Sequence, residues 1–178
     1  REFATDHVKI AVDASRTLEA LPATIAAMAE PPMRHDAVGF FLLSQEVSKH
    51  VKVVQSGQGA DEVFAGYHWY PKMMGSTDPV ADYARVYFDR DHAEMRETLR
   101  SELIGEDYSR DFIAEFFTRM GDADPVDKTL LLDTQVMLVD DPVKRVDNMT
   151  MAFGLEARVP FLDHELVELA ARIPAELK

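Results

Sequence analysis

A short apolar run that ends in a glycine-rich turn is the feature that most limits how this chain folds. Residues 51–67 have the sequence VKVVQSGQGADEVFAGY, in which β-branched residues lead into Gly57 and Gly59, and Asp61 and Glu62 follow at once. The pattern predicts a strand, a tight turn and the start of a helix. Glycines let backbone amides approach a ligand, and a helix N-terminus favours an anion. The segment therefore predicts an anion site, with a purely structural turn as the alternative.

Asp61 and Glu62 have the wrong charge for binding a bare phosphate. A divalent cation between the carboxylate and the phosphate oxygens would remove this repulsion, because Mg²⁺ takes oxygen ligands from both. A divalent cation is therefore the natural complement of these two carboxylates. The alternative is that Asp61 only places a favourable charge in the first turn of a helix, which is worth about 0.3–1 kcal/mol.

Composition and charge exclude several classes of protein. The 178 residues, 47% of them hydrophobic and 29% charged, suffice for one soluble domain with a core. The net charge of -13 argues against nucleic acid and against an anionic membrane surface as partners. The chain has no cysteine, so it has no disulfide or thiolate metal site, and we expect it to be cytoplasmic. Its apolar stretches are shorter than the roughly 20 residues of a membrane helix.

Strands are predicted at residues 7–12 and 51–55, with helices between them. The first run, HVKIAV, has β-branched alternation, and Asp13 can then cap a helix. Pro22 is not expected inside that helix, but it fits the first turn of a second one. Strand, helices and strand again are typical of a parallel α/β sheet, in which ligands bind beyond the carboxyl ends of the strands.

Beyond Gly75 the pattern predicts helices alone, which begin at polar caps or at prolines in the first turn. The expected starts are Asp78, Asp91, Glu106, Asp124, Asp147 and Asp163. The predicted fold class is therefore α/β and helix-rich. Residues 1–70 form the α/β part, which keeps a parallel sheet of two strands, and residues 71–178 form a helical part.

Two blocks of sequence resemble the synthetase domain of the asparagine synthetases. The first is SGQGADEVFAGY at 56–67, and the second is LEARVPFLDH at 155–164, after LVDDPVKRVDNMTMAFG at 138–154. The family has a Leu-Ser-Gly-Glu-Gly-Ala-Asp-Glu turn that ends in Gly-Tyr, and later a Leu-Glu-Ala-Arg-Val-Pro-Phe-Leu-Asp stretch. The resemblance runs from about His7 to the end and is weak between Pro71 and Val136. It implies that residues 1–178 are a fragment of a domain with an adenine-nucleotide-hydrolase-like sheet.

The resemblance implies that the turn binds ATP and its Mg²⁺-bound phosphates. The cofactor-binding residues would be Ser56, Gly57, Gln58, Gly59 and Asp61, and Asp61 would contact the metal and the pyrophosphate. A small-molecule carboxylate would react with ATP to give an acyl-adenylate and pyrophosphate, and ammonia would displace AMP to leave an amide. In the whole protein an N-terminal glutaminase domain would supply the ammonia.

Gln58 departs from the family, which has a glutamate at that position. An amide cannot accept a proton at neutral pH, although it can orient a reacting group. Either the chemistry needs no base there, or Glu62, Asp140, Asp141 or Asp147 supplies it. The departure favours amidation of a carboxylate other than aspartate, since SGQGADEVFAGY and LVDDPVKRVDNMTMA are also similar to N-acetylglutaminylglutamine amidotransferases.

Glu156 and Arg158 are two residues apart, so in an extended segment their side chains point the same way. We expect a structural pair, with a buried Arg158 that supports the second block, rather than direct contact with substrate.

A dense charged cluster precedes the second block. Its residues are Asp140, Asp141, Lys144 and Arg145. Solvated charge is the default explanation for such a cluster. The resemblance, however, places the stretch along the cleft for the acyl substrate, which makes these residues candidates for substrate binding or support.

Several parts of the family's site are not in this sequence. The resemblance implies a Ser-Gly-Gly pyrophosphatase loop before Arg1 and a basic residue after Lys178, and the chain has no cysteine for glutamine hydrolysis. We therefore expect a fragment that is inactive alone and binds Mg-ATP weakly or not at all. One alternative is a non-catalytic acidic helical module that meets a basic partner, and another is a different ATP-pyrophosphatase ligase of related fold.

Overall fold

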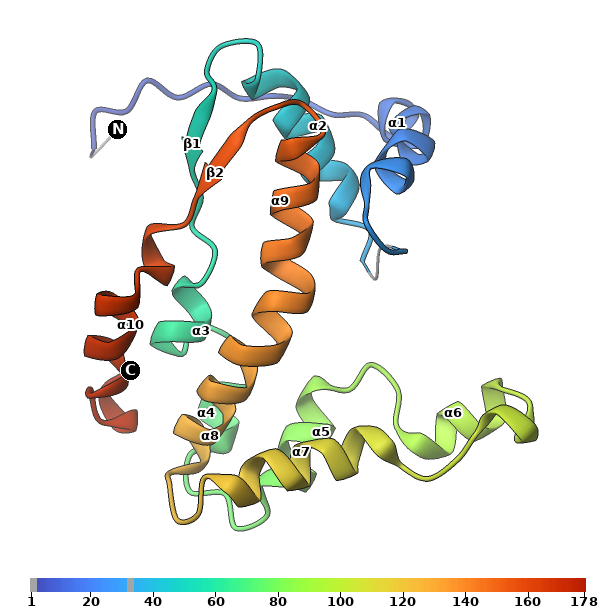
Figure 1. The fold of residues 1–178 in the computed structure, drawn as a ribbon, viewed down its shortest axis with the longest axis vertical. Coiled ribbons are helices and arrows are strands. Elements are labelled where there is room, and N and C mark those ends of the chain that lie inside the picture. The colour runs from blue at the N-terminus through green and yellow to red at the C-terminus, as the bar shows by residue number, and fades with distance from the viewer. Residues whose placement is uncertain (1–2, 32–33) are drawn as a thin grey trace. The chain divides into compact units, whose positions relative to one another are not determined.

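The computed structural model describes residues 3–31 and 34–178. In chain order its elements are α1 (Ala14–Ala27), α2 (Ala37–Val47), β1 (Val53–Gln55), α3 (Ala60–Phe64), α4 (Tyr70–Met73), α5 (Pro79–Tyr87), α6 (His92–Thr98), η1 (Ser101–Leu103), α7 (Tyr108–Arg119), α8 (Pro125–Leu132), η2 (Asp133–Met137), η3 (Val139–Val143), α9 (Lys144–Met151), β2 (Glu156–Arg158), η4 (Pro160–Leu162), α10 (His164–Ala171) and η5 (Ala175–Leu177). Segments η2 and η3 are π-helical, and the other η segments are 3₁₀ turns. The helix-rich α/β class with two parallel strands is confirmed (Figure 1).

The chain divides into two compact units, each made from two separate stretches of sequence. Unit 1 comprises residues 1–56 and 140–158, and unit 2 comprises residues 57–139 and 159–178. Unit 1 contains both strands with α1, α2 and α9, whereas unit 2 contains α3 to α8 and α10. Within the described ranges, no helix has the length and apolar character needed to cross a membrane.

The sheet of unit 1 pairs β1 with β2 in parallel, with Val53 opposite Glu156 and Gln55 opposite Arg158 (Figure 1). The strand predicted at 51–55 is confirmed by β1. The strand predicted at 7–12 is wrong, because that segment has no strand structure and Val8 is 78% exposed. Alternation of side chains makes a strand only where a partner completes the backbone hydrogen bonds, and β1 takes its partner from far along the chain. Because β2 lies at Glu156–Arg158, the part of the chain predicted to be helical, residues 71–178, is not helical throughout.

Pro22 lies inside α1 instead of opening a second helix, so that prediction is wrong. Asp13 caps α1 as expected, since its Oδ1 accepts a hydrogen bond of 2.8 Å from the Arg16 amide. A proline cannot donate to the carbonyl four residues earlier, here that of Leu18. Both residues are exposed, so water can bind that carbonyl and the helix continues.

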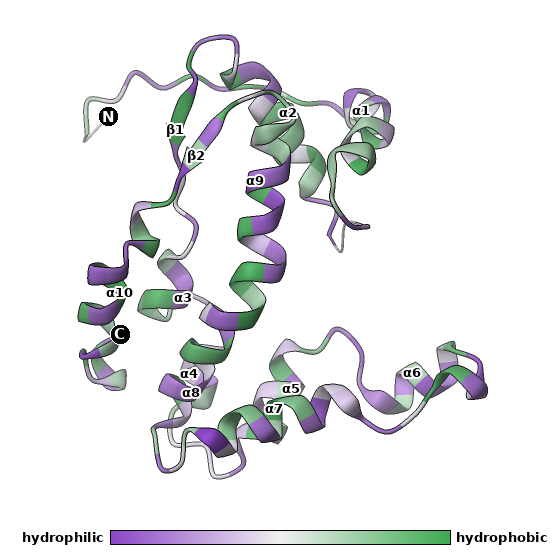
Figure 2. Ribbon diagram, viewed as in Figure 1, coloured by the Kyte–Doolittle hydropathy of each residue, from purple (hydrophilic) through white to green (hydrophobic). Residues whose placement is uncertain are grey.

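The core of unit 1 lies where α2 packs on α1 and α9. It consists of Ala20, Val38, Phe41, Leu42 and Met149. The Phe41 ring meets Phe153 edge-on, with 4.8 Å between centroids. Figure 2 shows hydrophilic and hydrophobic residues alternating along α9, as expected of a helix with one buried side. The charged residues at the start of α9 are thus carried on a well-packed helix.

The core of unit 2 is built by α4, α5, α7 and α8 and is rich in aromatic rings. Its buried members are Tyr70, Met73, Tyr83, Ile113, Phe117, Val126, Leu130 and Leu132. Asp78, Asp91, Asp124 and Asp163 cap α5, α6, α8 and α10 as expected. Two predicted starts are wrong: α7 begins at Tyr108 behind the cap Asp107 rather than at Glu106, and α9 begins at Lys144, before Asp147.

Candidate functional site

The glycine turn follows the carboxyl end of β1. The Ser56 amide donates to the Arg158 carbonyl at 2.8 Å, which continues the parallel pairing to the first residue of the turn. Gly57 is exposed, and a side chain there would meet no atom within 4 Å. Gly59 is buried with φ +91°, and a Cβ there would overlap the Leu162 side chain. Gly57 therefore offers open backbone to a ligand, whereas Gly59 lets the turn pack against the second sequence block.

Helix α3 brings Asp61 to the surface directly after the turn. The helix has only five residues, no side chain caps it, and it ends at Ala65 with φ 54°. Asp61 is exposed and its carboxylate lies against Gly66, where a Cβ would overlap it. So short a helix has a small dipole, so an anion at the turn would depend on backbone amides and on a cation.

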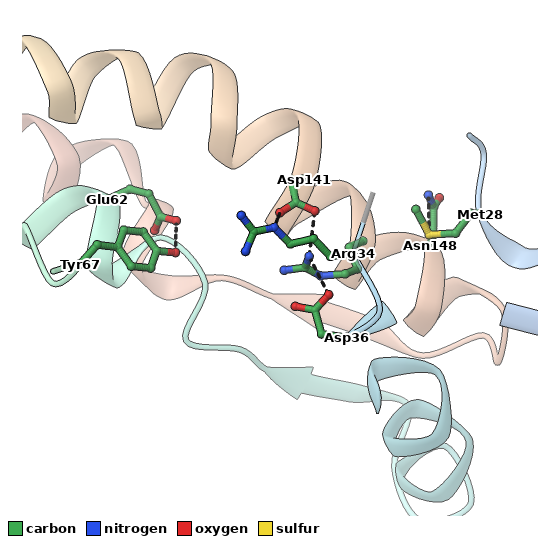
Figure 3. A network of polar contacts seen from close by, with 8 residues as sticks. Met28, Arg34, Asp36, Glu62, Tyr67, Asp141 and Asn148 are labelled. Carbon is green, nitrogen blue, oxygen red and sulfur yellow. Dashed lines mark hydrogen bonds and ion pairs between the residues drawn. The ribbon is translucent and has the colours of Figure 1, made fainter. Parts of the chain in front are cut away.

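Glu62 points into the interior of unit 2. It is 1% exposed, and its Oε1 accepts a 2.7 Å hydrogen bond from the Tyr67 hydroxyl (Figure 3). Burial and this hydrogen bond raise the pKa of Tyr67, so the phenol remains a donor. Glu62 also lines a cavity of about 260 Å³ whose other walls include Met120 and Leu130. No turn residue from 56 to 61 lines that cavity.

The polar side chains of the turn have no hydrogen bonds or ion pairs to the described residues. Ser56 and Gln58 are half-buried, and neither side chain makes a hydrogen bond or ion pair with any residue that the structure describes. The same holds for the Asp61 carboxylate. The amide of Gln58 is thus available both to donate and to accept a hydrogen bond.

The structure forms the predicted pair between Glu156 and Arg158 on β2. Arg158 Nε lies 3.3 Å from Glu156 Oε1. The expected burial of Arg158 is wrong, because its side chain is 69% exposed. In a sheet of two short strands, the alternate residues that face outward remain in water. An exposed pair of this kind contributes about 0–1 kcal/mol, so it does little to hold the second block.

Arg145 is the centre of the charged cluster in unit 1. Its side chain is 9% exposed, and one terminal nitrogen lies 2.8 Å from Asp141 and 3.1 Å from Asp36. Figure 3 labels these two aspartates. The guanidinium also lies over the Phe40 ring, 5.5 Å from its centroid, and its Nε has no hydrogen-bond partner among the residues that the structure describes. Solvated charge therefore does not describe Arg145, which joins α9 to the start of α2.

Lys144 makes a second set of contacts on the same helix. Its Nζ lies 2.6 Å from Glu30 and 3.6 Å from Asp140. These contacts, with Glu30 first, raise the pKa of Lys144. Asp147 differs from these residues, because it is exposed and its carboxylate has no hydrogen bond or ion pair to the described residues.

Sequence reasoning missed Asp133, the most deeply buried carboxylate of unit 2. It is 0% exposed and accepts hydrogen bonds from the Tyr83 hydroxyl at 2.5 Å and the Trp69 indole at 3.0 Å. Burial raises the pKa of Asp133 more than these bonds lower it. One signal was present in the sequence, since Asp133 is the only charged residue between Lys128 and Asp140.

A magnesium ion at Asp61 fits the turn if phosphates and water supply most of its ligands. In the described part of the chain, no three histidine or acidic side chains converge on a common point. An ion there would take most of its oxygen ligands from phosphates and water, which is how proteins commonly bind Mg²⁺. The open flank of Gly57 and the unpaired Asp61 fit a phosphate that carries its own cation.

The fold and the turn define a helix-rich α/β protein in which the carboxyl end of a parallel strand leads into open glycine backbone and an exposed aspartate. The chain belongs to the asparagine synthase family, because the family model described as "Asparagine synthase" matches residues 1–178.

Curated relatives agree with this assignment. The chain is 32% identical to a putative glutamine-hydrolyzing asparagine synthetase of Mycobacterium tuberculosis, over 97% of this chain and 32% of the relative. It is 25% identical to glutamine-hydrolyzing asparagine synthetase 1 of Bacillus subtilis, over 97% of this chain and 33% of the relative. A putative enzyme of the same name from Methanocaldococcus jannaschii is 34% identical over 72% of this chain and 15% of the relative. The chain thus spans about a third of the length of the first two relatives.

Proposed function

We propose that this chain is part of the synthetase domain of an asparagine synthetase-like amidotransferase. The enzyme would use ATP to adenylate a substrate carboxylate and would then form an amide with ammonia taken from glutamine. Family membership supports the reaction class. The observation that carries the site is the turn itself, where open backbone at Gly57 and the unpaired Asp61 follow the carboxyl end of a parallel strand.

In this proposal the turn binds the phosphates of ATP. A side chain at Gly57 would meet no atom within 4 Å, which leaves room for a phosphate beside the backbone there, and the Ser56 hydroxyl and Gln58 amide have no hydrogen bond to the described residues. Asp61 would hold Mg²⁺, which supplies positive charge for the phosphate oxygens when it is bound. Fixed donors at such a position favour the charge that develops on the leaving pyrophosphate.

The carboxylates differ in their availability for proton transfer. Glu62 is buried against Tyr67, Asp141 is paired with Arg145, and Asp140 lies near Lys144. The Asp147 carboxylate has no hydrogen bond or ion pair to the described residues, so we assign it as the carboxylate available to take a proton from the attacking ammonia. Gln58 would orient a substrate and not act as a base.

In the proposal, the ammonia and the acceptor come from outside this chain. An N-terminal glutaminase domain would release ammonia from glutamine, and the acceptor would be a small-molecule carboxylate. The glutamine at position 58 favours an acceptor other than free aspartate, so both aspartate and an acylated glutamine dipeptide belong in the test.

Carboxylate-dependent exchange between ATP and labelled pyrophosphate tests the proposal in the protein that contains this chain. We expect exchange with one of the carboxylates, and we expect Asp61→Asn to lower its rate on the order of 100-fold. Asp122→Asn is the matched control, because Asp122 is an exposed aspartate of unit 2 without a hydrogen bond or ion pair to the described residues. The proposal is wrong if neither carboxylate supports exchange, or if Asp61→Asn and the control have equal exchange rates.

A further inference from the structure

Asp133 lies at the start of the π-helical segment η2, and both of its oxygens accept hydrogen bonds from aromatic residues. Oδ1 accepts from the Tyr83 hydroxyl, and Oδ2 accepts from the Trp69 indole N–H. The Tyr70 hydroxyl is also buried, and within the described part of the chain it has no hydrogen bond of good geometry. A buried carboxylate is costly to keep without partners, so this arrangement fixes the Trp69 ring firmly.

Trp69 transmits this constraint to Glu62 through Tyr67. The rings of Trp69 and Tyr67 stack, with centroids 4.2 Å apart and 19° between their planes. The Tyr67 hydroxyl then donates to Glu62 at 2.7 Å. Because the stack sets the tilt of the Tyr67 ring, the position of Trp69 decides whether the hydroxyl reaches Glu62.

Thr134, the neighbour of Asp133, also contacts Glu62. Its hydroxyl lies 3.5 Å from the backbone carbonyl of Glu62, a long hydrogen bond. Segment η2 therefore approaches α3 both directly and through the two aromatic rings.

Helix α3 depends on such outside contacts. An isolated helix of five residues is not stable in water, and no side chain caps this one. The contacts that fix it are the buried Glu62 and Val63 and the packing of Leu162 on Gly59. Asp61 directly precedes Glu62, so any shift of Glu62 also moves Asp61.

We propose that Asp133 is a positioning residue for the glycine turn, which holds α3, and with it Asp61, through Trp69, Tyr67 and Glu62. Asp133 does not touch substrate in this proposal. Its effect on the reaction rests on the proposed function, whereas the coupling between Asp133 and α3 does not.

Hydrogen exchange of the backbone amides tests the coupling without any activity. In the protein that contains this chain, Asp133→Asn and Tyr67→Phe should each speed exchange in residues 60–66 by about 10-fold, because the first replaces the charged acceptor of Trp69 with a neutral amide and the second removes the hydroxyl that donates to Glu62. Asp107→Ala is the control, since it removes the cap of α7 in the same unit and leaves this path intact. Unchanged exchange in residues 60–66 of Asp133→Asn, or an equal increase in the control, overturns the proposal.

Kinetics of the ATP–pyrophosphate exchange test the positioning role. Asp133→Asn should raise the KM for Mg-ATP about 10-fold and change kcat far less, since Asp61 would be displaced from the phosphates while the reacting groups stay in place. The double variant with Tyr67→Phe should be no worse than the more affected single variant, because both changes act on one path. A KM equal to that of the parent, or additive effects, overturns the proposal.

The two measurements separate this inference from the proposed function. If the parent shows no exchange with any carboxylate, the proposed function fails, and the amide data alone decide whether Asp133 holds α3. If the parent is active but α3 is unaffected by Asp133→Asn, the proposed function stands and this inference fails.

Discussion

Gly57 and Gly59 lie two residues apart in one turn, yet their surroundings differ. Gly57 has an ordinary φ and open space where a side chain would stand, whereas Gly59 has φ +91° and faces Leu162. We therefore predict that Gly57→Ala changes the free energy of unfolding by no more than about 0.5 kcal/mol. Gly59→Ala should lower it by about 1–3 kcal/mol, because the new methyl group needs both a strained backbone and a displaced leucine.

Urea denaturation of the two variants and the parent, followed by circular dichroism, measures this difference. Gly57→Ala also serves as the control for any general effect of adding a methyl group to the turn. Equal losses in the two variants would mean that Leu162 moves aside, and the assigned packing of the second block on the turn would be wrong.

At this scale the sequence indicated which residues matter but not their surroundings. The two glycines look alike in SGQG, and Asp61 and Glu62 look like one acidic pair. Their separation into an exposed and a buried carboxylate depends on how α3 packs in unit 2, where Tyr67 donates to the Glu62 carboxylate and Thr134 contacts the Glu62 backbone carbonyl from 72 positions away in sequence. Asp133 was missed for the same reason, since its partners come from residues 50 and 64 positions away in sequence.

Among the secondary-structure elements, α6 and α10 both begin at an aspartate cap, but they differ in burial. Asp91 caps α6 in a full capping box with Glu94, and no residue of α6 is buried. Asp163 caps α10, whose Ala170 is 2% exposed. Loss of a cap costs about 1 kcal/mol, but the cost reaches the whole fold only if the helix unfolds together with the core.

We predict that Asp91→Ala speeds amide exchange within α6 and leaves the global Tm within about 1 °C of the parent, whereas Asp163→Ala lowers the Tm by several degrees. Calorimetry and hydrogen exchange on the same samples provide both quantities. A large drop in Tm for Asp91→Ala would show that α6 belongs to the cooperative core.

Helix starts were largely predictable, whereas strand partners and helix interiors were not. An N-cap depends on one side chain and the next three amides, so Asp13, Asp78 and Asp163 could be assigned from sequence. The partner of β1 depends on a pairing across about 100 residues, and the alternation at 7–12 was an equally good candidate before that pairing was known.

For the whole molecule, the stability of unit 2 should depend on pH through Asp133. Burial raises the pKa of this carboxyl above its ordinary value of 3.8, and the hydrogen bonds from Tyr83 and Trp69 reverse only part of the increase. The folded chain therefore keeps the proton to a higher pH than the unfolded chain. The stability contributed by this difference is fully present below about pH 4 and is lost as the pH rises through the folded-state pKa.

Asp133→Asn removes this titration while keeping a side chain of similar size. The free energy of unfolding of the parent minus that of the variant should be greatest below about pH 4 and should fall as the pH rises through the folded-state pKa, as urea titrations at several pH values would show. Asp122→Asn, which changes the net charge equally at an exposed site, is the control. A difference for Asp133→Asn that grows with pH would mean that the two aromatic donors outweigh burial and depress the pKa, and Asp133 would then be held in the fold as a permanent charge.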